Sequence, residues 1–188
     1  MDSRYISDIA FTPSVKNRQE EMGSRVAYQN MAEKRDWQTK ITEQLRFFIS
    51  KRDSFYMASA NADGQPYIQH RGGPKGFLKV LDDQHLAFAD FSGNRQYISV
   101  GNFDENNKVH LFLIDYPNRK RIKIWGEASI ITNESNLMEQ FIDKDYDVPI
   151  ERIIKIKITA WDINCPQHIQ QRYTIEEIKP YIDKLKNE

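Results

Sequence analysis

A glycine-rich stretch between two extended runs holds the first residues whose types could bind a ligand. Residues 69–78 read Gln-His-Arg-Gly-Gly-Pro-Lys-Gly-Phe-Leu. Glycine permits positive φ and lets a ligand approach backbone amides closely. Arg71 offers a planar fork of donors and Lys75 a compact charge, both suited to phosphate. This composition is typical of an anion-binding corner, but also of an ordinary glycine-rich turn with two solvated cations. The ligand-binding candidates are Arg71, Gly72, Gly73, Lys75 and Gly76.

A second candidate phosphate site is the stretch Ser92-Gly93-Asn94-Arg95, where a polar loop precedes a short helix expected over residues 95–101. Free amides and the dipole at a helix N-terminus favour an anion, and Arg95 would add a charge-assisted hydrogen bond. A helix cap with a surface arginine is the simpler interpretation of this loop alone. Two such loops close together in one small barrel favour a functional interpretation over an incidental one.

Other familiar chemistry is missing from the sequence. The histidines at positions 70, 85, 110 and 168 have no zinc-ligand spacing to one another or to the single cysteine, Cys165. Neither G-x-G-x-x-G nor a P-loop occurs, so the usual dinucleotide and nucleoside triphosphate fingerprints are absent. Trp125 and Trp161 lie near the ends of expected strands and could pack on a flat ligand, although core packing is the commoner role of tryptophan. The residues alone therefore predict a domain that binds a phosphorylated flat ligand.

Length, charge and composition restrict the class of protein. The 188 residues suit one domain over residues 1–188. Lys and Arg number 27, as do Asp and Glu, and this zero net charge argues against a general nucleic-acid binder. Hydrophobic residues make up 39%, which is low for a compact monomer, so a second subunit is expected to complete part of the core. A lone cysteine and the lack of an apolar leader or spanning run favour a cytoplasmic protein that does not enter membranes.

The elements that position these residues follow from periodicity. Residues 1–53 are expected to form a helical N-terminal extension, with helices over 14–32 and 37–51. From residue 54 the pattern changes to short β-branched and aromatic runs separated by turns. Strands are expected at 55–60, 65–71, 77–81, 85–90, 108–116, 120–132 and 151–163, with further helices at 135–142 and after Thr174. Hairpin spacing without crossover helices predicts an α+β fold, an antiparallel β-barrel with flanking helices.

The order of these segments resembles the pyridoxamine 5′-phosphate oxidase superfamily of FMN-binding split barrels, and within it a branch distinct from the true oxidases. The likeness covers nearly the whole chain, and its motifs are more specific together than apart. It implies an antiparallel split β-barrel with flanking helices, a homodimer, and FMN bound at the interface between the subunits. The motifs that carry it are Phe11-Thr12-Pro13, Gln19, Gly23-Ser24-Arg25, 55–60 with Asp63-Gly64, 71–77, Gly93-Asn94-Arg95, 125–128 and 160–169 followed by Arg172.

The resemblance also implies which residues bind the phosphate and ribityl chain of FMN. Arg71 and Lys75 match the cationic strand and loop that hold these parts of the cofactor. Asn94, Arg95 and Gln96 match the segment that cradles the phosphate. The two stretches singled out by their composition are thus the two that the resemblance assigns to phosphate.

A further set of residues matches the part of the family site that contacts the flavin ring. Arg121 matches a glutamine that touches the ring. Trp161 and Arg172 match the late pair that closes over the isoalloxazine, with one extra residue between them. His168 is expected over or beside the ring.

The expected substrate differs from that of the true oxidases. Those enzymes present an Arg-Leu-His segment to the substrate phosphate, where this chain has His168-Ile169-Gln170. A histidine cannot reproduce a guanidinium fork, so pyridoxamine 5′-phosphate is not the expected substrate. The leading hypothesis is an FMN-dependent oxidoreductase in which the flavin carries the electrons, Arg121 stabilises the reduced anionic flavin, and no catalytic acid or base is assigned. The alternatives are a flavin-binding sensor or carrier and a non-catalytic dimeric barrel. The sequence does not specify a small-molecule substrate or electron donor.

Overall fold

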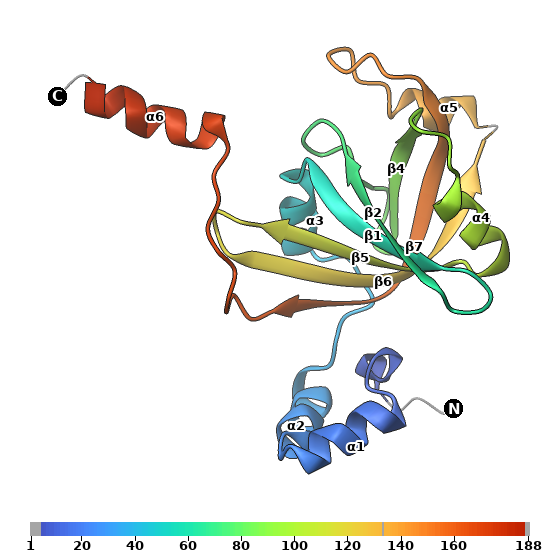
Figure 1. Ribbon diagram of the computed structural model, residues 1–188, viewed down its shortest axis with the longest axis vertical. Helices are drawn as coiled ribbons and strands as arrows, with labels where there is room; N and C mark the ends of the chain where they lie inside the picture. The colour runs from blue at the N-terminus through green and yellow to red at the C-terminus, as the bar shows by residue number, and fades with distance from the viewer. Residues whose placement is uncertain (1–4, 133, 187–188) are drawn as a thin grey trace.

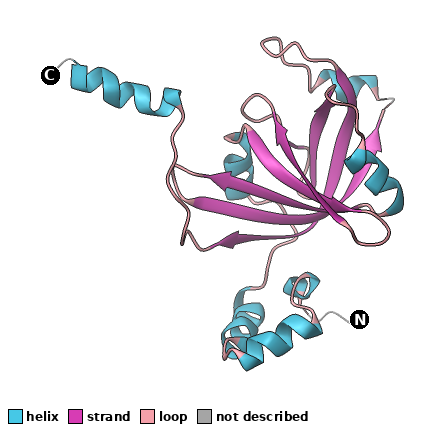
Figure 2. Cartoon of the chain, in the orientation of Figure 1, coloured by secondary structure: helices cyan, strands magenta, loops and turns pink. Residues whose placement is uncertain are grey.

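The computed structural model describes residues 5–132 and 134–186 of the chain. Within them, seven strands form one antiparallel sheet in the order β2-β1-β5-β6-β7-β4-β3 (Figures 1 and 2). The helices lie outside the sheet, which confirms the predicted α+β antiparallel architecture with flanking helices. The strands are β1 (Ser54–Ala60), β2 (Pro66–Gly72), β3 (Lys79–Val80), β4 (His85–Phe91), β5 (Lys108–Asp115), β6 (Lys120–Ile131) and β7 (Ile150–Asn164). The helices are η1 (Ile6–Ile9), α1 (Pro13–Glu21), α2 (Arg25–Arg35), α3 (Glu43–Ser50), α4 (Ile98–Glu105), α5 (Ser135–Glu139) and α6 (Ile175–Lys186).

Alternating apolar side chains build the core of the barrel. Strand β5 buries Val109, Leu111 and Leu113 at every second position, the pattern of a strand with one face on the core. Strands β1, β4, β6 and β7 add residues to the same core. Across the barrel, β2 is tied to β4 by an ion pair between Arg71 Nη1 and Asp90 Oδ1 at 2.5 Å, although the two strands are not neighbours in the sheet.

Helix α3 packs into this core and is shorter than expected. Its apolar side chains Leu45 and Ile49 are buried against the barrel. The Thr42 side chain accepts a hydrogen bond from the Leu45 amide at 3.2 Å and so caps the helix start. The helix expected over residues 37–51 therefore begins only at Glu43. The residues before it are extended because Gln38 pairs with β7.

The N-terminal segment forms two helices where one was expected over residues 14–32. Helices α1 and α2 are separated at Gly23, which has φ +72°, a conformation that glycine adopts without steric cost. They lie below the barrel in Figure 1. Trp37, in the segment that follows α2, stacks on Trp125 of β6 with ring centroids 4.6 Å apart. Residues 1–4 of the expected extension 1–53 lie outside the described residues, and the assignment of one domain to residues 1–188 stays a prediction.

The C-terminal arm, residues 165–186, leads away from the barrel. After β7, an irregular segment runs to α6, which projects from the body of the molecule (Figure 1). Thr174 and Glu177 form reciprocal capping bonds at the start of α6, with the Thr174 amide to Glu177 Oε2 at 2.8 Å and the Glu177 amide to Thr174 Oγ1 at 3.2 Å. None of the described helices has the length and hydropathy that crossing a membrane would require.

Candidate functional site

One pocket gathers side chains from both stretches that the sequence singled out. It has a volume of about 210 Å³ and lies between β2, the end of β4 and the start of α4. Arg71 lines it from β2, and the loop after β4 supplies Asn94, Arg95 and Gln96. Four predicted site residues from separate parts of the sequence therefore meet in one pocket. Their contact with a cofactor stays a prediction.

Arg71 belongs to a line of alternating charges that crosses three strands. Its Nη1 donates to Asp90 on β4 at 2.5 Å. The other Asp90 oxygen lies 3.4 Å from Nε of Arg152 on β7, and Arg152 donates in turn to Glu151. Arg71 and Asp90 side chains are only 13% and 9% exposed, so water screens their attraction weakly. The Arg71 Nε is buried without a hydrogen-bond partner among the described residues, and such an unused donor favours one more oxygen acceptor at this place.

The loop that carries Arg95 has an uncommon backbone. Arg95 and Tyr97 have φ of +59° and +54°, a region that costs a residue other than glycine about 1–3 kcal/mol. The Gln96 amide donates to Asn94 Oδ1 at 3.2 Å, which closes a local turn. Strained backbone of this kind persists where the surroundings fix it, often at binding sites.

This backbone also moves the start of helix α4. A helix needs negative φ, so α4 begins at Ile98 and not at Arg95, and the expected helix over 95–101 is corrected to 98–105. Tyr97 occupies the N-cap position without a capping bond from its side chain. The first turn of α4, with Ile98 and Ser99, lines the pocket. The pocket therefore combines two arginines with the positive end of a helix.

The glycine corner between β2 and β3 uses its own amides. The Gly73 amide donates to the Asp53 carbonyl at 2.9 Å, and the Gly76 amide to the Arg52 carbonyl at 2.8 Å. Gly76 has φ +80°, and a Cβ at Gly73 would lie 2.9 Å from a phenylalanine ring carbon. Backbone geometry and packing thus explain these glycines without a ligand. Ligand contacts of Gly72, Gly73 and Gly76 stay predictions.

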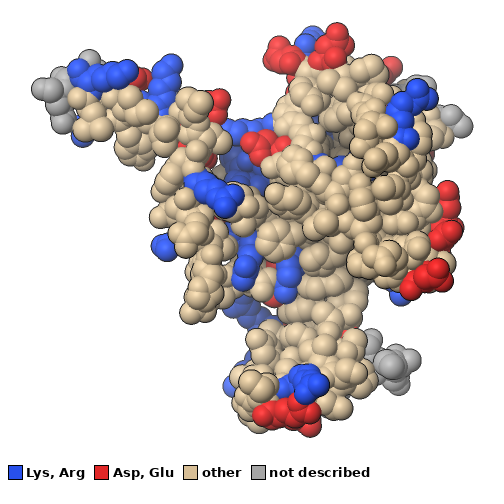
Figure 3. All heavy atoms as spheres, viewed as in Figure 1, with Lys and Arg blue, Asp and Glu red and all other residues tan. Residues whose placement is uncertain are grey.

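Lys75 and Arg172 line a different pocket, of about 350 Å³, beside the start of β1. The Arg172 guanidinium lies 4.9 Å from the centroid of the Tyr116 ring, a cation–π distance. Figure 3 shows Lys and Arg side chains gathered in the hollow between the barrel and the segment that leads to α6. Within one chain, the described lining of this pocket does not include Arg71 or Arg95.

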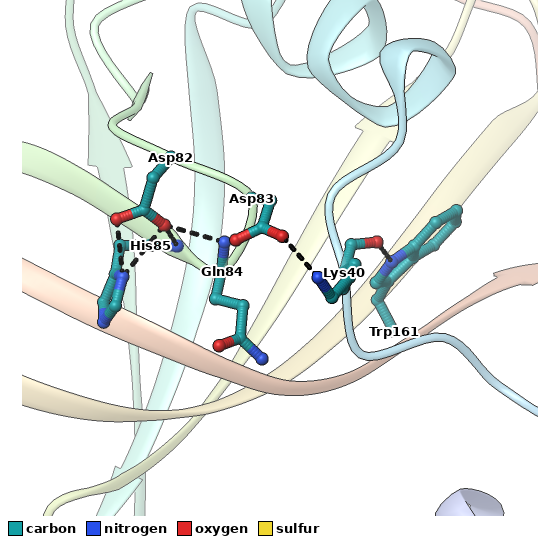
Figure 4. Close-up of polar contacts among 6 residues, drawn as sticks. All are labelled: Lys40, Asp82, Asp83, Gln84, His85 and Trp161. Carbon is teal, nitrogen blue, oxygen red and sulfur yellow. Dashed lines mark hydrogen bonds and ion pairs between the residues drawn. The ribbon is translucent and has the colours of Figure 1, made fainter.

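Trp161 is part of the barrel core. Its side chain is 4% exposed, and its indole Nε1 donates to the Lys40 carbonyl at 2.8 Å (Figure 4). Lys40 Nζ also binds Asp83 Oδ2 at 2.7 Å, in the turn between β3 and β4. Trp161 therefore holds the segment before α3 against the barrel. Trp161 also lines a neighbouring cleft. Its contact with a flavin ring stays a prediction.

Arg121 and His168 lie away from the Arg71 pocket. Arg121 is near the start of β6, and its Nε is buried with no hydrogen-bond partner in the described part of the chain. His168 is exposed, has φ +65°, and belongs to the irregular segment after β7. Near Arg121, burial lowers the pKa of Lys123, against the attraction of Asp162, and the positive charge of Arg121 lowers it further. Burial likewise raises the pKa of Asp162. The ring-contact predictions for Arg121 and His168 are untested.

Sequence reasoning missed the acidic half of the Arg71 pocket. Asp90 follows the apolar run Leu-Ala-Phe-Ala on β4, and Glu151 is the second residue of β7. An acid inside an apolar strand needs a cation beside it, and this signal at Asp90 predicts a buried partner. The sequence could not identify Arg71 as this partner, because β2 and β4 are not neighbours in the sheet and meet only where the sheet curls into a barrel. Within residues 5–132 and 134–186, no cluster of His, Cys, Asp and Glu could hold a metal ion.

Comparisons with known proteins agree with this architecture. The family model described as pyridoxamine 5′-phosphate oxidase matches residues 41–165. A comparison with curated proteins found no match. Similar solved structures include an FMN-binding protein from Syntrophomonas wolfei subsp. wolfei, with a TM-score of 0.54 and 15% identity over 78% of this chain and 97% of that one.

Two more structures share the fold. A putative pyridoxamine 5′-phosphate oxidase from Lactobacillus delbrueckii has a TM-score of 0.52 and 20% identity over 66% of this chain and 95% of its own. HupZ from Group A Streptococcus has a TM-score of 0.54 and 18% identity over 71% of this chain and 99% of its own. At these identities the likeness concerns the fold, and it confirms the predicted antiparallel split β-barrel with flanking helices.

Proposed function

Because this chain belongs to the pyridoxamine 5′-phosphate oxidase family, we propose that it is an FMN-binding flavoprotein and an FMN-dependent oxidoreductase. The observation that carries the proposal is the meeting of Arg71 with Asn94, Arg95 and Gln96 in one pocket. These are the residues that the family resemblance assigns to the phosphate.

The residues of the pocket fit a phosphate monoester. Arg71 has a buried Nε without a partner in the described residues, and Arg95 is exposed beside the first turn of α4. Two guanidinium groups and a helix N-terminus favour an anion with several acceptor oxygens. Asp90 already occupies one Arg71 nitrogen, so the phosphate would take the remaining donors and would not replace the ion pair.

The rest of the site is proposed to come from a second chain. Lys75, Arg121 and Arg172 are assigned to FMN by the resemblance, yet they do not line the Arg71 pocket of their own chain. A homodimer with the flavin at the interface would bring these cations of one chain to the phosphate pocket of the other. Because each chain would supply both halves, a two-fold dimer would hold two equivalent sites.

Bound FMN would supply the electron transfer, and the protein would bind and orient it. Arg71 and Arg95 would hold the phosphate. Arg121 would set the charge beside the ring. His168 stands where the true oxidases have an arginine for the substrate phosphate, and its imidazole offers fewer donors. A substrate without a phosphate group is therefore favoured over pyridoxamine 5′-phosphate.

The test is to measure the dissociation constants of FMN and riboflavin by flavin fluorescence. We expect FMN to bind more tightly, because riboflavin lacks the phosphate. Arg95→Ala should weaken FMN by about 1.5–3 kcal/mol, the range for a hydrogen bond to a charged group, and leave riboflavin unchanged. Arg18→Ala, on the exposed face of α1, is the matched control and should change neither.

Equal affinity for FMN and riboflavin would contradict the phosphate assignment. Bound FMN with no oxidation of NAD(P)H in the presence of an electron acceptor would instead favour a flavin sensor or carrier. Loss of folding in Arg95→Ala, seen by circular dichroism, would show that Arg95 is structural.

A further inference from the structure

Helix α6 has an apolar face that the described residues of its own chain leave uncovered. Ile175, Tyr181 and Leu185 are 78%, 73% and 73% exposed, and none of the described α6 residues is buried. A helix of this length is marginal in water, and most helical stability in proteins comes from packing of an apolar face. Pro180 inside the helix weakens it further. The stripe at helical spacing consists of Ile175, Ile178, Tyr181, Ile182 and Leu185.

The charges on α6 identify the kind of surface that would cover this stripe. Three acidic and three basic side chains lie on the helix, so it lacks the net positive charge by which amphipathic helices bind anionic lipid. At 100° per residue, Lys179 and Lys186 lie along one edge of the apolar stripe and Glu177, which caps the helix start, lies along the other edge. Glu176 and Asp183 lie on the opposite face. The stripe with its lysine border therefore suits an apolar cleft with an acidic rim.

The structure contains such a cleft on the far side of the barrel. It has a volume of about 360 Å³ and lies between α5 and the start of β7. Its floor is apolar, with Phe91 and Phe141, and Ile142 at its edge is 65% exposed. The loop after α5 carries Asp143 and Asp147 on the rim, and Figure 3 shows acidic side chains gathered over this loop at the top of the view.

We propose that α6 of one copy of this chain packs into the cleft between α5 and β7 of a second copy. The proposal rests on the homodimer proposed above and adds the position of the C-terminal helix in it. Apolar side chains would fill the cleft floor, and the bordering lysines would face Asp143 and Asp147. Exchange of the two arms satisfies two-fold symmetry, because each chain offers one helix and one cleft.

The arm is anchored so that α6 points away from the cleft of its own chain. Gln171 Nε2 donates to the Pro117 carbonyl at 2.8 Å, and Arg172 packs on Tyr116. These contacts hold the arm at the turn between β5 and β6, and α6 extends outward from there, on the side opposite α5 (Figure 1). The cleft would therefore be filled from another chain.

The cleft also adjoins the candidate phosphate pocket. Phe91 lines both. A helix seated in the cleft would therefore rest beside the residues proposed to bind phosphate, and the arm that carries His168 and Arg172 would be held at both ends. The arm exchange would thus help to fix these two residues in the dimer.

Disulfide trapping between two different chains tests the inference. One chain carries Ile142→Cys and the other Leu185→Cys, each with Cys165→Ser because the native thiol is exposed. Both replaced side chains are exposed, so neither change should impair folding. We expect a disulfide dimer when the two chains are co-expressed and oxidised, and no such product from either chain alone.

Each other result would overturn the inference. Self-crosslinking of Leu185→Cys alone would indicate pairing of α6 with α6. A monomer with an internal disulfide in the Ile142→Cys/Leu185→Cys double variant would indicate docking within one chain. Light scattering separates the two proposals: a monomer would contradict the homodimer itself, whereas a dimer without the 142–185 disulfide would contradict only the arm exchange.

Charge reversal provides a second measurement on the trapped pair. Lys179→Glu with Lys186→Glu on the helix, or Asp143→Lys with Asp147→Lys on the cleft, should each slow disulfide formation by about threefold or more. Combining both reversals should restore the rate. Glu176→Lys on the opposite face of α6 is the control and should leave it unchanged. No effect of either reversal, or no recovery on combination, would contradict the proposed facing of lysines and aspartates.

Discussion

At the scale of single residues, the candidate site shows what chemical type can and cannot reveal. The arginine fork of Arg71 makes it a candidate for binding an anion, although the sequence around it is equally typical of an ordinary glycine-rich turn. Its closest partner, however, is Asp90 of the protein itself. The several donors of one arginine can be divided between the fold and a ligand, and Arg71 Nη1 is already used by the fold. The residue type thus identifies a guanidinium group that can bind an anion. The structure shows which of its N–H donors are already used within the protein.

His110 provides a prediction of pH dependence at this scale. It packs edge-on against Trp125 with ring centroids 4.7 Å apart. Burial, and then the charge of Lys123, hold its pKa below the ordinary value of 6.5. The unfolded chain therefore binds a proton at a higher pH than the folded one, so stability is fully present above about pH 6.5 and decreases as the pH falls towards the lowered pKa.

We expect His110→Phe to remove this part of the pH dependence. The measurement is the free energy of unfolding in urea at about pH 7.5 and about pH 5.5 for both proteins. The loss between the two pH values should be larger for the native chain than for the variant, which keeps an aromatic ring against Trp125. Equal losses would show that His110 titrates in the folded state as it does in the unfolded state.

At the scale of elements, the strands follow their sequence pattern closely and the helices less so. The hairpin strands agree with their expected bounds to within a residue or two because alternation and turn residues are local signals. The helix expected over 37–51 lost its first part to strand pairing by Gln38 with Trp161, a contact between distant residues. The helix expected over 14–32 is divided at Gly23, whose φ of +72° lies outside the helical region. The spacing of hydrophobic residues along the sequence does not show which distant residues pair or where a residue adopts positive φ.

The bulge that β7 forms opposite Gly126 of β6 gives a prediction at the element scale. The register of β6 against β7 shifts between Trp125 and Gly126. A Cβ at Gly126 would lie 2.6 Å from the Lys157 carbonyl oxygen and 2.7 Å from an Ile156 methyl carbon. The Gly126→Ala variant must displace backbone on β7, so its free energy of unfolding should fall by about 1–3 kcal/mol.

Gly101→Ala is the matched control. It lies inside α4, where an added Cβ would meet nothing within 4 Å. Alanine there should raise the free energy of unfolding by about 0.5–1 kcal/mol, because glycine lowers helix stability. Urea titration of the two variants measures both changes in the free energy of unfolding. If both variants are destabilised by similar amounts, the close packing around Gly126 does not explain the loss of stability.

At the scale of the whole molecule, the predicted site residues fall into separate groups. The barrel, its class and its phosphate-suited loops could be predicted from the sequence, because each depends on local pattern or on a family likeness. The grouping of Lys75 and Arg172 in a pocket apart from Arg71 could not, since it depends on how the sheet closes. The homodimer proposed above would bring these cations together, because the second group of one chain would face the Arg71 pocket of the other.

Subunit complementation decides whether the two groups belong to one site across the proposed dimer. Arg95→Ala damages the phosphate pocket, and Arg172→Ala damages the second group, so each homodimer should bind FMN weakly. If a site takes Arg95 from one chain and Arg172 from the other, random mixing should restore native affinity to about a quarter of the sites, one in each mixed dimer. If both residues serve the same chain's site, no site in the mixture is intact. A fluorescence titration that resolves tight and weak FMN sites distinguishes the outcomes, and a mixture that binds no better than its parents would contradict a shared interface site.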